Sequence, residues 1–214
     1  MVKIIKHVWG ANEVWAAAAY ATRINGGYYK NTVFSKYEKV DKLSNKELIL
    51  SALEDTTQIP EQDYETGKLA SKFISQRCML RKLKNKMTDF DRSMARICAM
   101  EDFTLQDRYE IAMVGSQIQS YLNGVKEIHI LEEADRSAGY LGKVGERFEF
   151  QVTIHKTVWS EKYGLYFYTG ITSTKQPVIF SNKKRIAENI ETTVKGTVKL
   201  HRDQFTHFNR VKIV

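Results

Sequence analysis

The spacing of apolar residues changes along the chain, and this change limits the possible folds more than any other feature. Before about residue 130, apolar residues recur at intervals of three, four and seven, the period of a helix that buries one face. From Arg147 onward they recur at every second position, the period of a half-buried strand. The pattern predicts an α+β protein, with a helical domain in residues 1–136 and a β domain in residues 137–214.

The helical part contains a start signal that is repeated three times. A Ser or Thr stands three residues before a Glu or Asp, the spacing of a capping box, in the pairs Ser44 with Glu47, Thr88 with Asp91 and Thr104 with Asp107. We expect Asn12 to cap an earlier helix and Gly26 to end it. The apolar stripes that follow are predicted to be core: Leu69, Phe73, Leu80, Leu83, Met87, Phe90, Met94, Ile97, Leu105, Tyr109, Ala112 and Met113.

Two segments of the helical part have two interpretations each. The cations between residues 77 and 86 suit either a helix C-terminus, where they complement the backbone dipole, or a phosphate contact, and we favour the first. The turn at residues 23–28 is either structural or a contact loop, and we favour the structural role.

The β part divides into five strands, predicted at residues 147–155, 165–172, 178–180, 193–200 and 208–214. Residues 182–190 are predicted to form a short helix between the third and fourth strands. This order is typical of an OB-like β-barrel, whose second and third strands and flanking loops bind oligonucleotides or oligosaccharides. An SH3-like barrel is the alternative, but it offers no natural place for the helix.

The positive charge lies in the β part. The 214 residues carry a net charge of +8, and residues 137–214 contribute +7 of it, with 13 Lys and Arg against 6 Asp and Glu. Cations concentrated in one domain favour a polyanionic partner such as nucleic acid.

Aromatic residues on one predicted strand refine this expectation. If Leu165 and Phe167 point into the barrel, Tyr166 and Tyr168 point outward, where nucleobases can stack on them. The alternative is a purely structural role, because tyrosines are good strand formers and lysines protect sheet edges. The predicted nucleic-acid-binding residues are Lys156, Trp159, Tyr166, Tyr168, Lys183, Lys184, Lys199, Arg202 and Arg210.

Residues 142–150, 195–201 and 206–212 resemble a C-terminal segment found in many uncharacterised bacteriophage proteins. Residues 15–28 are more weakly similar to the N-terminal parts of such proteins. The resemblance implies a phage-encoded OB-like domain that acts in the cytoplasm of an infected bacterium, and it supplies no catalytic residues. The loop at residues 170–176 departs from the pattern because it lacks an acidic residue and a Gly-Asn turn.

The chain contains residues that occur in catalytic motifs, but their spacing does not match those motifs. The triplet formed by His201, Arg202 and Asp203 echoes a kinase motif, but no glycine-rich phosphate loop precedes it. Two remaining sets match no strong metal motif, namely the histidines His155, His201 and His207 and the acids Glu132, Glu133 and Asp135. We therefore expect no catalytic residue, no metal and no cofactor.

The chain also shows no apolar run of about 18 residues and no secretory signal after Met1, so we expect neither a membrane span nor export. With two cysteines, a reducing cytoplasm is the expected compartment.

Together these features predict a non-catalytic protein that binds single-stranded DNA, or alternatively RNA, in phage DNA replication or recombination. The helical domain is expected to form a homo-oligomer or to contact a phage or host protein. The alternative function is a protein-interaction module that inhibits or adapts a host replication, transcription or defence complex.

Overall fold

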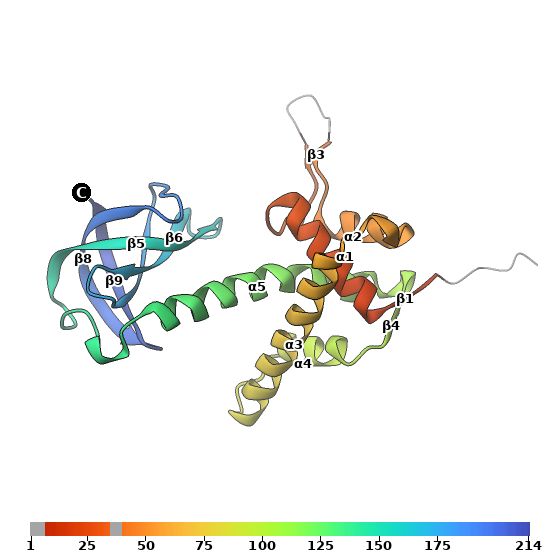
Figure 1. Cartoon of the computed structure of the whole chain (residues 1–214), viewed down its shortest axis with the longest axis horizontal. Helices are drawn as coiled ribbons and strands as arrows, with labels where there is room; N and C mark the ends of the chain where they lie inside the picture. Colours follow the sequence, from red (N-terminus) through yellow and green to blue (C-terminus); the bar gives the residue numbers. More distant parts are fainter. Residues whose placement is uncertain (1–6, 35–39) are drawn as a thin grey trace, which may run out of the picture. The chain divides into compact units, whose positions relative to one another are not determined.

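The computed structural model describes residues 7–34 and 40–214 (Figure 1). Helices dominate up to residue 133, and five long strands follow from Arg147, which confirms the predicted α+β class. Two compact units divide between Leu122 and Asn123, inside one long helix. The last part of that helix therefore belongs to the same unit as the strands. Residues 1–6, where the sequence predicts no signal peptide, lie outside the described residues.

The helical unit contains α1 (Ala11–Asn25), α2 (Asn45–Glu54), α3 (Glu61–Leu83), α4 (Asp89–Cys98) and the first part of α5 (Arg108–Glu133). Two small antiparallel ladders, which the sequence analysis missed, pair β1 (Val8–Gly10) with β4 (Asp102–Thr104) and β2 (Val33–Phe34) with β3 (Val40–Lys42). Short 3₁₀ turns occupy Thr56–Gln58, Leu105–Asp107 and Arg136–Ala138.

The three predicted capping boxes are confirmed. Ser44 with Glu47 begins α2, Thr88 with Asp91 begins α4, and Thr104 with Asp107 begins the 3₁₀ turn that leads into α5. Gly26 ends α1 in the left-handed conformation, at φ 66°. The prediction that Asn12 caps α1 was wrong, because the helix begins at Ala11 and its N-cap is Gly10, two residues before Asn12. The Glu13 carboxylate accepts the Gly10 N–H at 2.8 Å.

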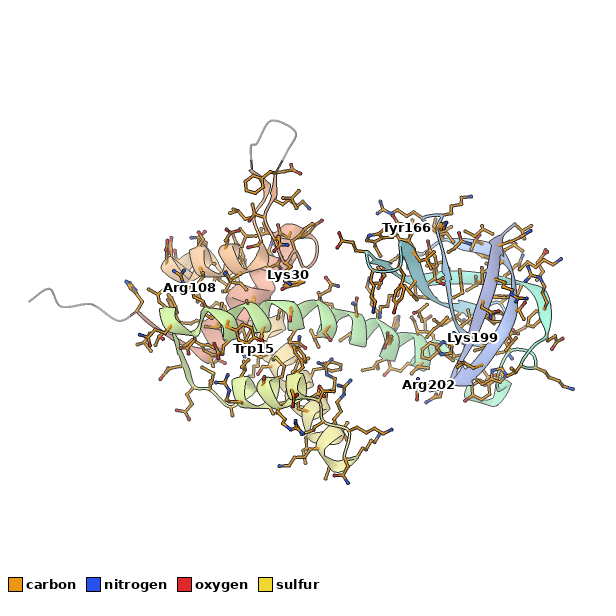
Figure 2. The ribbon with its side chains drawn as sticks, turned by 180° about the vertical axis from the view of Figure 1, so that it is seen from behind. Trp15, Lys30, Arg108, Tyr166, Lys199 and Arg202 are labelled. Carbon is orange, nitrogen blue, oxygen red and sulfur yellow. The ribbon has the colours of Figure 1, made fainter. Side chains whose placement is uncertain are left out.

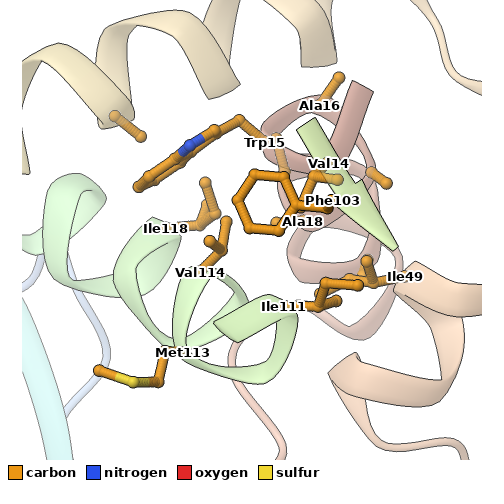
Figure 3. Close-up of a cluster of buried hydrophobic side chains, with 14 of the residues drawn as sticks. Val14, Trp15, Ala16, Ala18, Ile49, Phe103, Ile111, Met113, Val114 and Ile118 are labelled. Atoms are coloured by element: carbon orange, nitrogen blue, oxygen red, sulfur yellow. The ribbon is translucent and has the colours of Figure 1, made fainter. Parts of the chain in front are cut away.

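The core of the helical unit is built around two rings. Trp15 of α1 and Phe103 of β4 are buried and lie together, with Val114 and Ile118 of α5 beside them (Figure 3). The Trp9 indole, at the edge of this core, donates a hydrogen bond to the Leu53 carbonyl at 2.9 Å. Burying rings and branched side chains at this density is the main source of stability in a domain.

The face of α3 that enters the core differs from the prediction. Leu69, Leu80 and Leu83 are exposed, and the buried positions are instead Asp63, Gly67, Ala70, Ile74 and Cys78. Small residues are needed there because α1 passes very close. A Cβ at Gly67 would lie 2.6 Å from the carbonyl carbon of Trp15. Phe90, Leu105 and Tyr109 are also exposed rather than core.

The second unit is a closed five-stranded barrel. Its strands are β5 (Arg147–Ser160), β6 (Leu165–Thr172), β7 (Pro177–Asn182), β8 (Glu191–Arg202) and β9 (Phe205–Ile213). They close in the order β5-β6-β7-β9-β8, and all pairs are antiparallel except β7 with β9. A Greek-key closure of five strands is the OB-like arrangement that the sequence predicts.

The barrel encloses the side chains that the alternating pattern of β5 and β8 predicts. Phe150, Val152 and Ile154 of β5 meet Val194 and Val198 of β8 in the interior. Outside the barrel, Ile130 of α5 packs against Ile171 and Phe205 in a second, smaller cluster. The end of α5 thus covers part of the outer surface of β6 and β9, so residues there are buried on both faces.

The helix predicted over residues 182–190 is absent from the structure, which shows an irregular connection there. Backbone bonds to β5 prevent a helix, because Asn189 N–H donates to the Ile154 carbonyl at 2.6 Å and Ile154 N–H donates to the Ile190 carbonyl at 2.9 Å. The Glu188 carboxylate also accepts the Thr157 N–H at 3.0 Å. Groups used in this way cannot make intrahelical bonds.

Candidate nucleic-acid interface

Two aromatic side chains lie across from each other on the β5–β6 hairpin. Trp159 pairs with Tyr166 in the antiparallel register, and their ring centroids are 4.6 Å apart. The Trp159 side chain is 51% exposed, whereas Tyr166 is half-buried against the barrel core. An indole held by a neighbouring ring while half of it meets solvent is a preformed stacking surface for a base.

Cations follow directly on the next strand. Tyr166 is paired with Asn182, the last residue of β7, and the exposed residues Lys183, Lys184 and Arg185 continue from it. Within the described part of the chain, none of these three side chains forms an ion pair. The aromatic pair and these free cations therefore lie at the same end of the barrel, where a base and its phosphates can be contacted together.

A side-chain bond brings β9 to this end as well. Asn182 Nδ2 donates to the Val211 carbonyl at 2.9 Å, which places the exposed Lys212 next to the end of β7. Lys212 is paired in turn with Lys195 of β8, whose side chain is also exposed. We call Trp159, Tyr166, Lys183, Lys184, Arg185, Lys195 and Lys212 the hairpin-end surface.

The prediction that Tyr168 points outward was wrong. Its side chain is fully buried in the barrel core and stacks on Phe180, with ring centroids 5.0 Å apart. The hydroxyl donates to the Lys184 carbonyl and accepts the Ile186 N–H, so burial leaves no polar atom without a partner. Phe167, predicted inward, is 37% exposed. Tyr168 cannot stack on a base while the barrel is folded.

The prediction that Lys156 lies in an exposed connection was also wrong. It belongs to β5, beside a bulge, and only 8% of the residue is accessible. Its ammonium donates to Glu127 of α5 at 2.6 Å. Lys156 therefore holds the end of α5 on the barrel and is not available to a phosphate.

The remaining predicted cations, Lys199, Arg202 and Arg210, are exposed, but Lys199 and Arg202 do not gather with the aromatic pair. Lys199 and Arg202 lie toward the end of β8 that is opposite to its first residue, Glu191, and away from Tyr166 (Figure 2). Arg202 forms an exposed ion pair with Asp203 at 3.1 Å. Arg210 lies on β9 at a left-handed position, with φ 51°, two residues from Lys212.

Sequence reasoning missed two aromatic residues of the same hairpin. Tyr163, in the turn, is 61% exposed, and its ring meets Phe167 edge-on with centroids 6.1 Å apart. The Lys162 ammonium lies 5.3 Å from the Tyr163 ring centroid. The signal was present in the sequence, because four aromatic residues fall within nine positions around a glycine turn.

Two of the cations between residues 77 and 86 have a structural role, as the sequence analysis favoured. Arg81 binds both oxygens of Asp91 at 2.8 Å, and Arg77 donates to Gln117 and Ser120. Lys82, Lys84 and Lys86 stay exposed at the end of the helix.

The described ranges 7–34 and 40–214 contain neither a metal-binding cluster nor a membrane-spanning helix. No cluster of three or more His, Cys, Asp or Glu side chains there is arranged to hold a metal ion. Among the helices described, none combines the length and apolar character needed to cross a bilayer.

Comparison with known proteins found no matching family model, no similar curated protein and no similar solved structure.

Proposed function

We propose that the barrel unit binds single-stranded nucleic acid, with single-stranded DNA as its first ligand and RNA as the alternative. The observation that carries the proposal is the half-exposed Trp159, held against Tyr166 beside the unpaired Lys183, Lys184 and Arg185. Stacking on aromatic rings combined with phosphate contacts is how proteins hold single strands without reading their sequence.

The wider setting of the proposal rests on the resemblance of residues 142–150, 195–201 and 206–212 to phage proteins. It supports a phage-encoded protein of the bacterial cytoplasm. The single-strand binding proposed for the barrel is in turn the basis for proposing a non-catalytic role in DNA replication or recombination. The charge distribution agrees, because the net +7 of residues 137–214 suits a polyanion.

Tryptophan fluorescence provides a direct test. The chain has three tryptophans, and Trp9 and Trp15 are 6% and 3% exposed, so a quencher that stacks from solvent reaches mainly Trp159. We expect a thymine oligonucleotide to quench the full-length protein, and duplex DNA of equal length to quench it much less. In Trp159→Phe the quenching should vanish while binding, followed by anisotropy of a labelled strand, persists.

Two further variants measure the contacts. Trp159→Ala and Tyr166→Ala should each weaken binding by about 1 to 3 kcal/mol with little change in salt dependence. Absence of binding by the folded full-length protein at about 50 mM salt, where phosphate contacts are strongest, contradicts the proposal.

A protein-interaction role for the helical unit is favoured by a separate observation. Leu69, Met79, Leu80 and Leu83 of α3 are between 52% and 69% exposed, an unusual concentration of bare apolar side chains on one helix. Light scattering after gel filtration tests self-association, which Leu80→Glu with Leu83→Glu should abolish. A monomer at all concentrations instead favours a phage or host partner.

A further inference from the structure

The helical unit has a pocket that the proposed function does not use. It is an open depression of about 670 Å³ between the segment after α1, the start of α2 and the first turns of α5. This volume falls in the range of about 300 to 1,000 Å³ that is usual for small-ligand sites. The pocket includes Tyr28, the last residue of the turn that the sequence analysis considered as a contact loop.

Three aromatic rings line this pocket without stacking on one another. Tyr109 is 69% exposed, Phe34 61% and Tyr28 37%, and within residues 7–34 and 40–214 none of them packs against another ring. Met113, a buried residue at the edge of the core, also lines the pocket, and in Figure 3 its side chain points away from Val114 and Ile118. Apolar rings left in water favour a flat apolar ligand.

Gly115 of α5 lies close to two neighbouring segments at this end of the helical unit. A Cβ at Gly115 would lie 2.8 Å from Ile49 Cδ1, the end of a flexible side chain, and 4.0 Å from Tyr28 Cε2. Both α2 and the segment after α1 therefore pass near α5 at this position.

The charge at the pocket favours an anion. Lys30 and Lys46 line it, both are exposed, and in the described part of the chain neither ammonium forms an ion pair (Figure 2 labels Lys30). The one acid in the lining, Glu47, is occupied, because its carboxylate accepts hydrogen bonds from Thr32 and from the Ser44 backbone and hydroxyl. These bonds, with the Thr32 contribution first, also keep the pKa of Glu47 below its ordinary value.

We propose that this pocket binds a nucleotide, with the base against the rings of Tyr109 and Phe34 and the phosphate at Lys30 and Lys46. The combination of unstacked rings and free cations is what favours a base joined to a phosphate over a purely apolar ligand. The nucleotide comes either from solution or from a single strand. The inference is independent of the barrel, since every residue it uses belongs to the helical unit.

The test uses the full-length protein with the hairpin-end surface disabled by Trp159→Ala, Lys183→Glu and Lys184→Glu, so that failure of the barrel proposal cannot affect the result. Calorimetric titrations compare adenosine monophosphate, adenosine, inorganic phosphate and a short adenine strand. Adenosine monophosphate or the strand should bind more tightly than adenosine or phosphate. Binding of the mononucleotide alone identifies a free nucleotide as the ligand, and binding of the strand alone identifies a strand.

Matched variants decide whether the pocket is responsible. Tyr109→Ala and Lys30→Glu should each weaken the binding roughly tenfold, whereas the exposed controls Phe90→Ala and Lys82→Glu should leave it unchanged. Circular dichroism confirms the fold, which these exposed positions do not support. Equal affinity in the pocket variants and the controls, or no binding of either nucleotide probe at millimolar concentration, overturns the proposal.

Discussion

The buried ion pairs of the helical unit and the hairpin-end surface of the barrel unit use charged side chains in opposite ways. In the helical unit, Arg23 binds Asp63 and Arg81 binds Asp91, and both carboxylates are buried. In the barrel unit, Lys183, Lys184 and Arg185 have no carboxylate partner among the residues that the structure describes, and they stand beside the half-exposed Trp159. A charge held by a partner supports the fold, whereas a charge without one is free for a ligand. Where cations lack partners is therefore more informative than the total charge.

The largest effect is expected from Tyr168, which tests whether this side chain belongs to the core or to the ligand site. We predict that Tyr168→Ala costs the barrel about 3 to 5 kcal/mol of unfolding free energy, because the side chain is fully buried. Tyr168→Phe should cost only about 1 to 2 kcal/mol, since it loses the hydroxyl bonds and keeps the ring. Urea unfolding followed by circular dichroism measures both. A stable Tyr168→Ala that no longer binds single strands would contradict the assignment to the core.

A second prediction concerns the two faces of α3. Ile74→Ala should lower the unfolding free energy by about 2 to 5 kcal/mol because Ile74 is fully buried. Leu80→Ala, on the exposed face, should change it by no more than about 0.5 kcal/mol. The same urea experiment applies, and a reversed order would restore the leucine face as the core face.

The third prediction tests whether paired charges support the helical unit. Burial raises the pKa of Asp91, but bonds from Thr88 and Arg81 outweigh it and hold the pKa at about 2, below the ordinary 3.8. Because the folded pKa is depressed, the stabilisation is complete above about pH 4 and is lost as the pH falls toward 2. Asp91→Asn should cost about 1 to 3 kcal/mol at neutral pH and flatten the stability profile in that window.

That profile is measured by urea unfolding at a series of pH values. Asp89→Asn provides the control, since Asp89 is exposed and pairs with Arg92 on the helix surface. An equal loss in both variants would mean that the buried pair contributes nothing beyond the surface charge.

The smallest effects are expected from single cations. Lys183→Ala and Lys184→Ala should each lower the slope of log affinity against log salt by about 0.7, the single-strand value for one phosphate contact. Lys82→Ala and Lys84→Ala, equally exposed at the end of α3, should leave the slope unchanged. Anisotropy of a labelled strand across a salt series measures all four. Equal slopes in the two pairs would remove the distinction between the units.

Strand positions and helix starts were predictable because their signals are local. In a capping box such as Thr88 with Asp91, the cap side chain bonds a backbone group three residues away, and no distant part of the chain is needed. Strand β6 was predicted at its observed bounds for the same reason, since its flanking turns and period lie within a few residues.

The candidate site was only partly predictable. Trp159, Tyr166, Lys183 and Lys184 do lie at one end of the barrel, but the sequence could not say that Lys199 and Arg202 lie toward the other. Nor could it say that Glu127 would cover Lys156, because that contact joins positions 29 residues apart.

The sequence by itself determined the three capping boxes, the strand order and the concentration of positive charge in the last third. The tertiary structure alone decided which face of β6 and of α3 is inside. In β6 both faces carry aromatic or aliphatic residues, so the alternating pattern allows either face to point into the barrel. In the observed arrangement Tyr168 points inward, and its hydroxyl forms hydrogen bonds with the backbone of residues 184 and 186. In α3 the close passage of α1 at Gly67 requires small residues, which places the larger leucines in solvent. Both choices depend on packing between distant segments, which a local pattern does not contain.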